Sequence, residues 1–345
     1  MNKFNDEALK NLTICIFTLN RHQELTRLVK FLTGTKMKIL ILDASNESKF
    51  LLRNDNLEYF HVPNMPLQER LRKFAELATT KYLLLSPDDD YWAPNGVSEV
   101  LQFLEKNLDY ASAQGLRIRF FDFPFFHWIP DYVNQMTLDF SQENKVERLR
   151  DMATGMHYIY SVIRRNEYIK ITNCLREVNS IKRNAAMMSE LIFNYTLPLL
   201  GKHKVLPVFY SARKAHPYEA GDVNFNQWVN DKSDRDAVKF SENIINFYTK
   251  ELDIIESQAS SVFHQLTKEF SRPKQEPAKK LKSFKNSLRI VFTRTKLRGF
   301  RKISKVKYLY FYKLLFVNKT FFIFVSDILR IKRFLDKNRF NIEKV

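Results

Sequence analysis

The chain has 345 residues, a length typical of one large domain or two of ordinary size. Hydrophobic residues make up 45% and charged residues 27% of it, which excludes a wholly disordered protein. The 7 glycines, 11 prolines and 2 cysteines exclude a collagen-like chain and a disulfide-built domain, and no C-x-x-C zinc pattern occurs. We therefore expect a globular protein of a reducing compartment.

The net charge of +18 is concentrated at one end of the chain. Residues 271–345 contain 22 Lys and Arg but only 4 Asp and Glu, whereas residues 1–270 contain 34 of each kind. A basic tail on a neutral body indicates contact with an anionic surface, and it carries no information about the fold of the body.

No segment has the pattern of a signal peptide or a spanning helix. The apolar run Leu12–Leu19 follows a segment that contains acidic residues, and it lacks a small-residue cleavage site. The longest apolar stretch, Tyr308–Val325, is interrupted by Lys313 and Lys319, so it does not supply the ~18 apolar residues that a spanning helix needs. We predict a cytoplasmic protein.

Residues 1–115 alternate between short apolar runs and amphipathic helical patterns. Four runs predict buried strands: Leu12–Thr18, Lys38–Asp43, Leu57–Val62 and Lys81–Ser86. Helical patterns follow the first, third and fourth runs; Asn20 can cap the first helix, and Pro94 suits the first turn of the last. This alternation predicts a parallel sheet with right-handed crossovers.

Polar clusters follow three of these strands, at the edge where parallel sheets bind ligands. Thr18-Leu-Asn20-Arg21 follows the first strand, Asp43-Ala-Ser45 the second, and Asp88-Asp89-Asp90 the fourth. Because the carboxyl ends of parallel strands meet at one edge of the sheet, we expect the clusters to form one site.

The triple aspartate predicts a metal and diphosphate site. Carboxylate oxygens suit Mg²⁺ or Mn²⁺, which hold diphosphates through few protein ligands. The alternative is an acidic turn that caps the helix beginning near Pro94. We favour the metal site, because one carboxylate suffices for a cap and three adjacent like charges repel one another.

In order and spacing, these clusters and the following Tyr91-Trp92 resemble nucleotide-sugar-dependent glycosyltransferases of the GT-A fold, family-2-like. The resemblance covers about the first 115 residues. It implies an α/β, Rossmann-like GT-A nucleotide-sugar-binding sheet, to which the sequence adds a basic, mainly helical C-terminal extension. The residues that it implies at the donor are Thr18, Asn20, Arg21, Asp43, Asp88 and Asp89. Asp43 would contact the base or ribose, and Asp88 and Asp90 would form the metal-binding Asp-x-Asp element.

A sugar nucleotidyltransferase is the nearest competitor on a similar sheet. It would need a glycine-rich phosphate loop after the first strand, where this chain has Thr-Leu-Asn-Arg and no glycine. We therefore set it aside.

Residues of the second half complete the predicted site. Direct transfer to a hydroxyl needs a base, and Glu190 resembles the family's base ahead of a Leu-rich helix, with Asp151 as the runner-up. His216 resembles the family's late histidine and would complete the metal shell. Arg213 and Arg70 could neutralise the leaving diphosphate. The alternatives are an ordinary helix glutamate and a surface histidine.

The sequence therefore predicts a metal-dependent, inverting glycosyltransferase that moves a sugar from a nucleotide-sugar donor to a glycan or lipid-linked acceptor, in surface polysaccharide biosynthesis. We divide it into a domain at 1–270, with a donor half at 1–115 and an acceptor half at 116–240, and a basic region at 271–345. The alternatives are a nucleic-acid-binding protein acting through that region and a non-catalytic sugar-binding module. No known nucleic-acid-binding motif is present.

The basic region interleaves charge with apolar residues. We expect residues 281–333 to bind an anionic membrane surface as an in-plane helix, which places the protein at the inner face of the cell membrane. A helical cap packed on the catalytic domain is the alternative.

Overall fold

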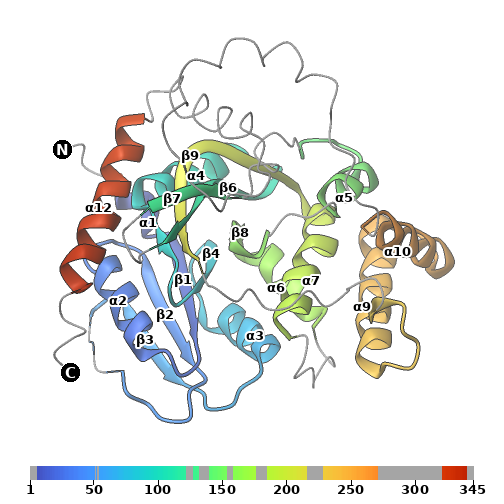
Figure 1. Ribbon diagram of the computed structural model, residues 1–345. Coiled ribbons are helices and arrows are strands. Elements are labelled where there is room, and N and C mark those ends of the chain that lie inside the picture. Colours follow the sequence, from blue (N-terminus) through green and yellow to red (C-terminus); the bar gives the residue numbers. More distant parts are fainter. Residues whose placement is uncertain are drawn as a thin grey trace, which may run out of the picture.

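The computed structural model describes residues 6–50, 52, 54–121, 127–131, 140–153, 158–175, 185–215, 228–270 and 321–339. In these ranges nine strands form one sheet with helices on both faces (Figure 1). The expected α/β fold class is confirmed.

The first half follows the predicted alternation. Its elements are α1 (Asp6–Leu9), β1 (Leu12–Thr18), α2 (His22–Leu32), β2 (Lys38–Asp43), β3 (Leu57–His61), α3 (Leu67–Leu77), β4 (Tyr82–Pro87), β5 (Tyr91–Trp92) and α4 (Pro94–Lys106). The four predicted strands pair in parallel in the order β3-β2-β1-β4. Strands β1, β2 and β4 are almost fully buried, whereas β3 lies at the edge of the sheet and is only partly buried, so the prediction of a buried strand there was wrong. Pro94 opens α4 as expected.

The second half extends the same sheet. Its elements are β6 (Tyr110–Phe121), β7 (His127–Asp131), α5 (Lys145–Ala153), the short 3-10 helix η2 (Tyr158–Tyr160), β8 (Val162–Arg164), α6 (Arg165–Asn173), α7 (Ala185–Leu200), β9 (Lys202–Lys214), α9 (Arg235–Leu252), α10 (Glu256–Phe270) and α12 (Phe321–Arg339). The sheet continues β4-β8-β6-β9-β5, with β7 paired to β6. It is therefore mixed, because β8 runs antiparallel to both β4 and β6.

The two faces of the sheet carry separate hydrophobic cores. One contains residues of α1, α2, α4 and α12, and the other contains residues of α3, α6, α7, α9 and α10. Gly96 brings α4 against the sheet, because a Cβ there would lie 1.8 Å from the main-chain oxygen of Phe209 in β9. This close approach fixes the segment that follows the triple aspartate.

Two further local predictions were wrong. The sequence pattern of residues 243–270 predicts one helix, but the structure has two helices, α9 and α10, separated at Asp253, whose φ is 55°. Asn20 does not cap α2: it has a φ of 56° and precedes Arg21, which occupies the N-cap position without a capping side-chain bond.

The C-terminal region is described only at α12. The buried side chains of Ile328, Ile331 and Leu335 in α12 belong to the core that α2 and α4 line. Helix α12 lies beside α2 and α4 (Figure 1). This part of the basic region therefore forms a helical cap, while residues 271–320 lie outside the described ranges. Among the described helices, none combines the length and the apolar character required to cross a bilayer.

Candidate functional site

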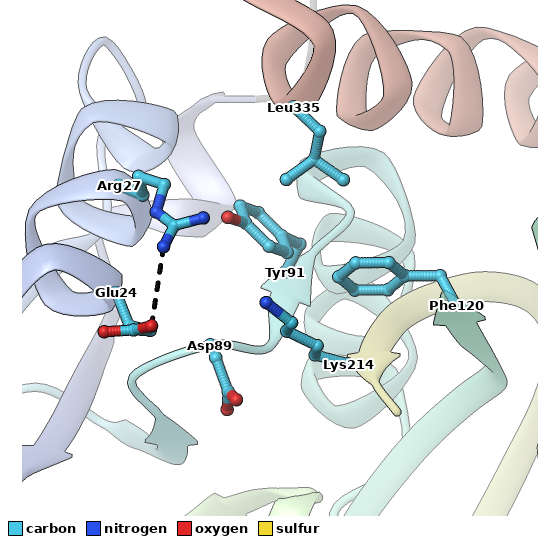
Figure 2. A pocket seen from close by; sticks show the side chains of 7 residues that line it. All are labelled: Glu24, Arg27, Asp89, Tyr91, Phe120, Lys214 and Leu335. Atoms are coloured by element: carbon cyan, nitrogen blue, oxygen red, sulfur yellow. Dashed lines mark hydrogen bonds and ion pairs between the residues drawn. The ribbon is translucent and has the colours of Figure 1, made fainter. Parts of the chain in front are cut away.

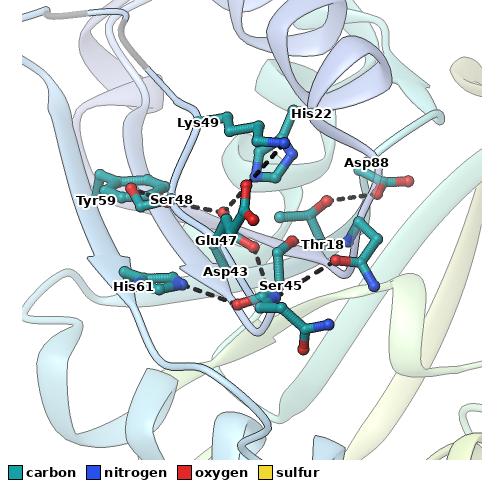
Figure 3. Close-up of polar contacts among 12 residues, drawn as sticks. Thr18, His22, Asp43, Ser45, Glu47, Ser48, Lys49, Tyr59, His61 and Asp88 are labelled. Carbon is teal, nitrogen blue, oxygen red and sulfur yellow. Dashed lines mark hydrogen bonds and ion pairs between the residues drawn. The ribbon is translucent and has the colours of Figure 1, made fainter.

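The predicted clusters meet at one edge of the sheet. The β1–β2 register pairs Thr18 with Asp43, and the N–H of Ala44 donates to the carbonyl of Thr18 over 3.1 Å. The main-chain N–H of Asn20 donates to Oγ of Ser45 over 2.7 Å. Figure 3 shows Ser45 together with Thr18, Asp43 and Asp88 at this edge. Asn20 reaches this bond in the left-handed conformation, which asparagine tolerates better than most residues.

Asp43 organises the end of β2. Its carboxylate is 0% exposed; Oδ1 accepts from the N–H of Ser45 (2.9 Å), and Oδ2 accepts from Tyr59 Oη (2.7 Å) and lies 3.0 Å from Nε2 of His22. Burial raises the pKa of Asp43, but the bonds from Ser45, Tyr59 and His22 outweigh burial and leave that pKa below its ordinary value. Asp43 is therefore an ionised anchor whose oxygens already have protein donors. Its side-chain partners His22 and Tyr59 lie at the end of the sheet where the nucleotide is expected.

Asp88 joins the end of β4 to the end of β1. Oγ1 of Thr18 donates to its Oδ2 over 2.8 Å, and an Arg21 nitrogen lies 3.0 Å from its Oδ1. The second terminal nitrogen of Arg21 lies 2.5 Å from Oδ2 of Asp89. Arg21 thus bridges two neighbouring carboxylates, and the expected grouping of these residues at one site is observed.

Asp90 faces the second half of the sheet. Its Oδ1 accepts from the N–H of Lys214 over 3.2 Å, and its Oδ2 lies 3.8 Å from a guanidinium nitrogen of Arg117 in β6. Arg213, in β9, also contributes positive charge to the surroundings of Asp90. The acidic loop is therefore held by both halves of the sheet.

Burial sets the protonation of the acidic loop. Asp88 and Asp90 are 3% and 2% exposed. The pKa of each is raised to about 7, chiefly by burial and also by the charge of Asp89, whereas Arg21 opposes the rise at Asp88 and Arg117 opposes it at Asp90. Two buried carboxylates with raised pKa values would be stabilised in their ionised form by a further cation.

The donor chemistry fits a divalent ion that a nucleotide diphosphate also ligates. Hard oxygen ligands are available from Asp88 and Asp90, and Mg²⁺ commonly uses one or two carboxylates together with substrate phosphates. The described residues contain no group of three or more His, Cys, Asp or Glu side chains placed to hold a metal by themselves. The third predicted ligand, His216, lies outside the described ranges.

Arg70 lies beneath the site. Its guanidinium is buried, donates to the carbonyl of Thr18 over 3.2 Å, and lies 5.2 Å from the ring centroid of Phe17. Burial lowers its pKa, while the charges of Asp43 and Asp88 oppose that effect. In this arrangement Arg70 holds the end of β1.

The two candidate bases lie on different elements. Glu190 is half-buried in α7, and Oη of Tyr160 donates to its Oε1 over 3.3 Å. Asp151, exposed on α5, accepts a hydrogen bond from the side chain of Gln142. Glu190 is connected to the acidic loop by way of Tyr160 and Arg117.

A small pocket opens beside the acidic loop, between α2 and α12 (Figure 2). The residues that line it are Glu24, Arg27, Asp89, Tyr91, Phe120, Lys214 and Leu335. Asp89 and Tyr91 place the loop on one side of this pocket, and Leu335 of α12 closes another. The last described helix thus reaches the edge of the candidate site.

Sequence reasoning missed four residues of the site: His22, Tyr59, Arg117 and Tyr160. His22 and Tyr59 bond to Asp43, and Arg117 and Tyr160 lie between Asp90 and Glu190. Only His22 could have been found, because it directly follows the polar cluster after β1. The others depend on strand register and on packing between distant segments.

No protein-family model and no curated protein matches the chain. Among solved structures, residues 1–349 of S. aureus TarS in complex with UDP-GlcNAc match with 12% identity and a TM-score of 0.50, over 96% of this chain and 92% of that one. Another structure of the same TarS residues matches with 12% identity and a TM-score of 0.47, over 96% and 91%. A longer TarS structure matches with 11% identity and a TM-score of 0.47. The match covers 81% of this chain but only 46% of the longer TarS chain.

The match to the UDP-GlcNAc complex of TarS covers almost the whole of both chains, and at 12% identity it is a likeness of fold. The chain has the Rossmann-like GT-A fold that the sequence resemblance implied.

Proposed function

We propose that the protein is a metal-dependent glycosyltransferase that takes a sugar from a nucleotide-sugar donor. The observation that carries this proposal is the convergence of Asp43, Asp88 and Arg21 at the carboxyl edge of the parallel strands. Parallel α/β sheets bind their ligands at this edge. That TarS has been solved with UDP-GlcNAc on a similar fold supports a nucleotide-sugar donor.

The donor would lie across the ends of β1, β2 and β4. Asn20, His22 and Tyr59 surround the anchored Asp43 and offer polar contacts to the base and ribose. Asp88 and Asp90 would hold Mn²⁺ or Mg²⁺ together with the diphosphate, and His216 is the remaining candidate ligand. The metal would offset the charge that develops on the departing nucleoside diphosphate.

Glu190, in the acceptor half, would act as the general base. The acceptor hydroxyl oxygen would attack the anomeric carbon while its proton passes to the Glu190 carboxylate. The bond from that carbon to the diphosphate oxygen breaks, and the diphosphate leaves with the electron pair. Arg21 and Arg213 lie close to the acidic loop and supply positive charge to it. A single displacement of this kind inverts the anomeric configuration.

The acceptor that we propose is a glycan or a lipid-linked sugar of surface polysaccharide biosynthesis, reached from the inner face of the membrane. Support comes from the +18 charge, all of which resides in residues 271–345. Basic and apolar residues that alternate in this way favour an anionic lipid surface.

A donor screen tests the function. Purified protein is incubated with a panel of nucleotide sugars, with and without Mn²⁺, and release of the nucleoside diphosphate is measured. We expect Mn²⁺-dependent release from one donor and weak or absent release from the others. If no donor binds or is hydrolysed while the chain binds oligonucleotides with a steep salt dependence, the nucleic-acid alternative is favoured instead.

A further inference from the structure

A chain of contacts links the acidic loop to the candidate base. Arg117 of β6 lies 3.8 Å from Oδ2 of Asp90. Its guanidinium carbon lies 4.9 Å from the ring centroid of Tyr160, in the 3-10 helix η2. The hydroxyl of Tyr160 then donates to Oε1 of Glu190 over 3.3 Å. Two residues from elements far apart in the sequence, Arg117 and Tyr160, therefore connect the carboxylates of Asp90 and Glu190.

Both ends of Tyr160 are held. Its carbonyl accepts from Oη of Tyr210 in β9 over 3.0 Å, and its ring lies against the guanidinium of Arg117. Arg117 is itself fixed, because its Nε donates to Oγ of Ser211 over 3.2 Å. The hydroxyl of Tyr160 is thus presented to Glu190 from a rigid frame.

A fixed phenol can serve as a lasting donor to a carboxylate. Burial raises the pKa of Tyr160 well above its ordinary value, and the charges of Glu190 and Asp90 raise it further, so the hydroxyl keeps its proton. A bond from this hydroxyl to Oε1 restricts rotation of the Glu190 carboxylate. Restricting this rotation also fixes the direction in which the second oxygen, Oε2, faces.

We propose that Tyr160 is a positioning residue of the transfer reaction, which orients Glu190 as the base and ties it through Arg117 to the acidic loop. The proposal rests on the proposed function, since it needs Glu190 to accept the acceptor's proton. Tyr160 itself exchanges no proton with the substrate.

The test compares Tyr160→Phe with a matched control. Phenylalanine keeps the ring against Arg117 and removes only the hydroxyl. Tyr158→Phe removes a hydroxyl from the same 3-10 helix, and Oη of Tyr158 has no hydrogen-bond partner among the described residues. We expect Tyr160→Phe to lower kcat about tenfold with the donor KM within about twofold, whereas Tyr158→Phe leaves both unchanged. Thermal unfolding of each variant confirms that the folded fraction is the same.

A double-mutant cycle with Glu190→Gln shows whether Tyr160 acts through the base. If it does, Tyr160→Phe adds no further loss in the Glu190→Gln protein. Full kcat in Tyr160→Phe, or a tenfold loss that persists in the Glu190→Gln background, would overturn the proposal while the glycosyltransferase function stands. If the wild-type protein turns over none of the donors, both the positioning role of Tyr160 and the glycosyltransferase function are contradicted.

Discussion

Asn95, at the start of α4, donates a hydrogen bond from its Nδ2 to Oδ1 of Asp327 in α12 over 3.1 Å. The two residues lie 232 positions apart in the sequence, and Asp327 is buried. The bond fastens the last described helix to the helix that follows the acidic loop. It also places an ionisable group in a core, which makes the packing of α12 sensitive to pH.

Stability should fall as Asp327 ionises. Burial raises the pKa of Asp327 to about 6, and Asn95 and Arg330 only partly oppose the shift. A carboxyl whose pKa is raised by folding favours the folded state below its unfolded pKa, and loses this contribution as the pH rises through the folded pKa. This pKa shift corresponds to a contribution of about 3 kcal/mol at most to the free energy of unfolding. Asp327→Asn should remove this dependence.

The measurement is thermal unfolding of wild type and Asp327→Asn at pH 5 and pH 7.5. We expect the wild type to lose stability relative to the variant between these two values. An identical pH dependence in both proteins would show that Asp327 is solvated or that α12 is undocked in solution.

The packing of α12 gives a second prediction with a matched control in the same helix. Ile331 is buried in the core with α2 and α4, whereas Leu329 is 39% exposed. Ile331→Ala should destabilise the protein by about 2–4 kcal/mol, and Leu329→Ala by no more than about 0.5 kcal/mol. Denaturant unfolding measures both free energies. Equal small effects would mean that α12 does not pack on the body.

Activity should require a divalent cation together with Asp88 and Asp90. Asp88→Ala and Asp90→Ala are each expected to lower turnover by roughly 10²-fold or more, because the diphosphate would leave without its counter-charge. Asp55→Ala, an exposed carboxylate of the same half, serves as the control and should keep full turnover. Turnover that persists in EDTA, or in a folded Asp88→Ala/Asp90→Ala protein, would rule out a metal at this loop.

Glu190→Gln should separate donor binding from transfer. Glutamine keeps the size of the side chain but cannot take up the acceptor's proton, so the donor Kd should persist while transfer falls by roughly 10²-fold or more. Asp151→Asn, on α5, is the comparison. If only Asp151→Asn impairs transfer, then Asp151 is the base and Glu190 is an ordinary helix residue.

The basic region should bind anionic membranes while α12 stays docked. A chain ending at Phe270 would also lose α12 and uncover a core, so neutralisation is the cleaner change. We expect sedimentation with anionic liposomes to weaken when four tail lysines become glutamine: Lys279, Lys280, Lys282 and Lys285. Each contributes about 1 kcal/mol at most near an anionic surface.

The control neutralises four exposed lysines of the body: Lys30, Lys106, Lys232 and Lys268. This protein should sediment as the wild type does, with release at high salt. Equal sedimentation of the tail and body variants would contradict a membrane role for the tail. Loss of oligonucleotide binding in the tail variant alone would support the nucleic-acid alternative.

The sequence by itself determined the parallel half of the sheet. Runs such as Leu12–Thr18 and Lys38–Asp43 are apolar over a strand length, and such runs can be stable only when buried on both faces. Their polar carboxyl ends therefore had to meet at one edge, and Thr18 and Asp43 do pair there. Local patterns carry this information because each strand is specified by consecutive residues.

Only the tertiary structure decided how the site is held. Arg117, Tyr160 and Asp327 stand in segments without a motif, and their partners lie tens to hundreds of positions away. The antiparallel β8 and the docking of α12 likewise depend on which faces remain uncovered once the parallel strands have formed. Packing between distant segments is a property of the assembled core, so no local spacing in the sequence records it.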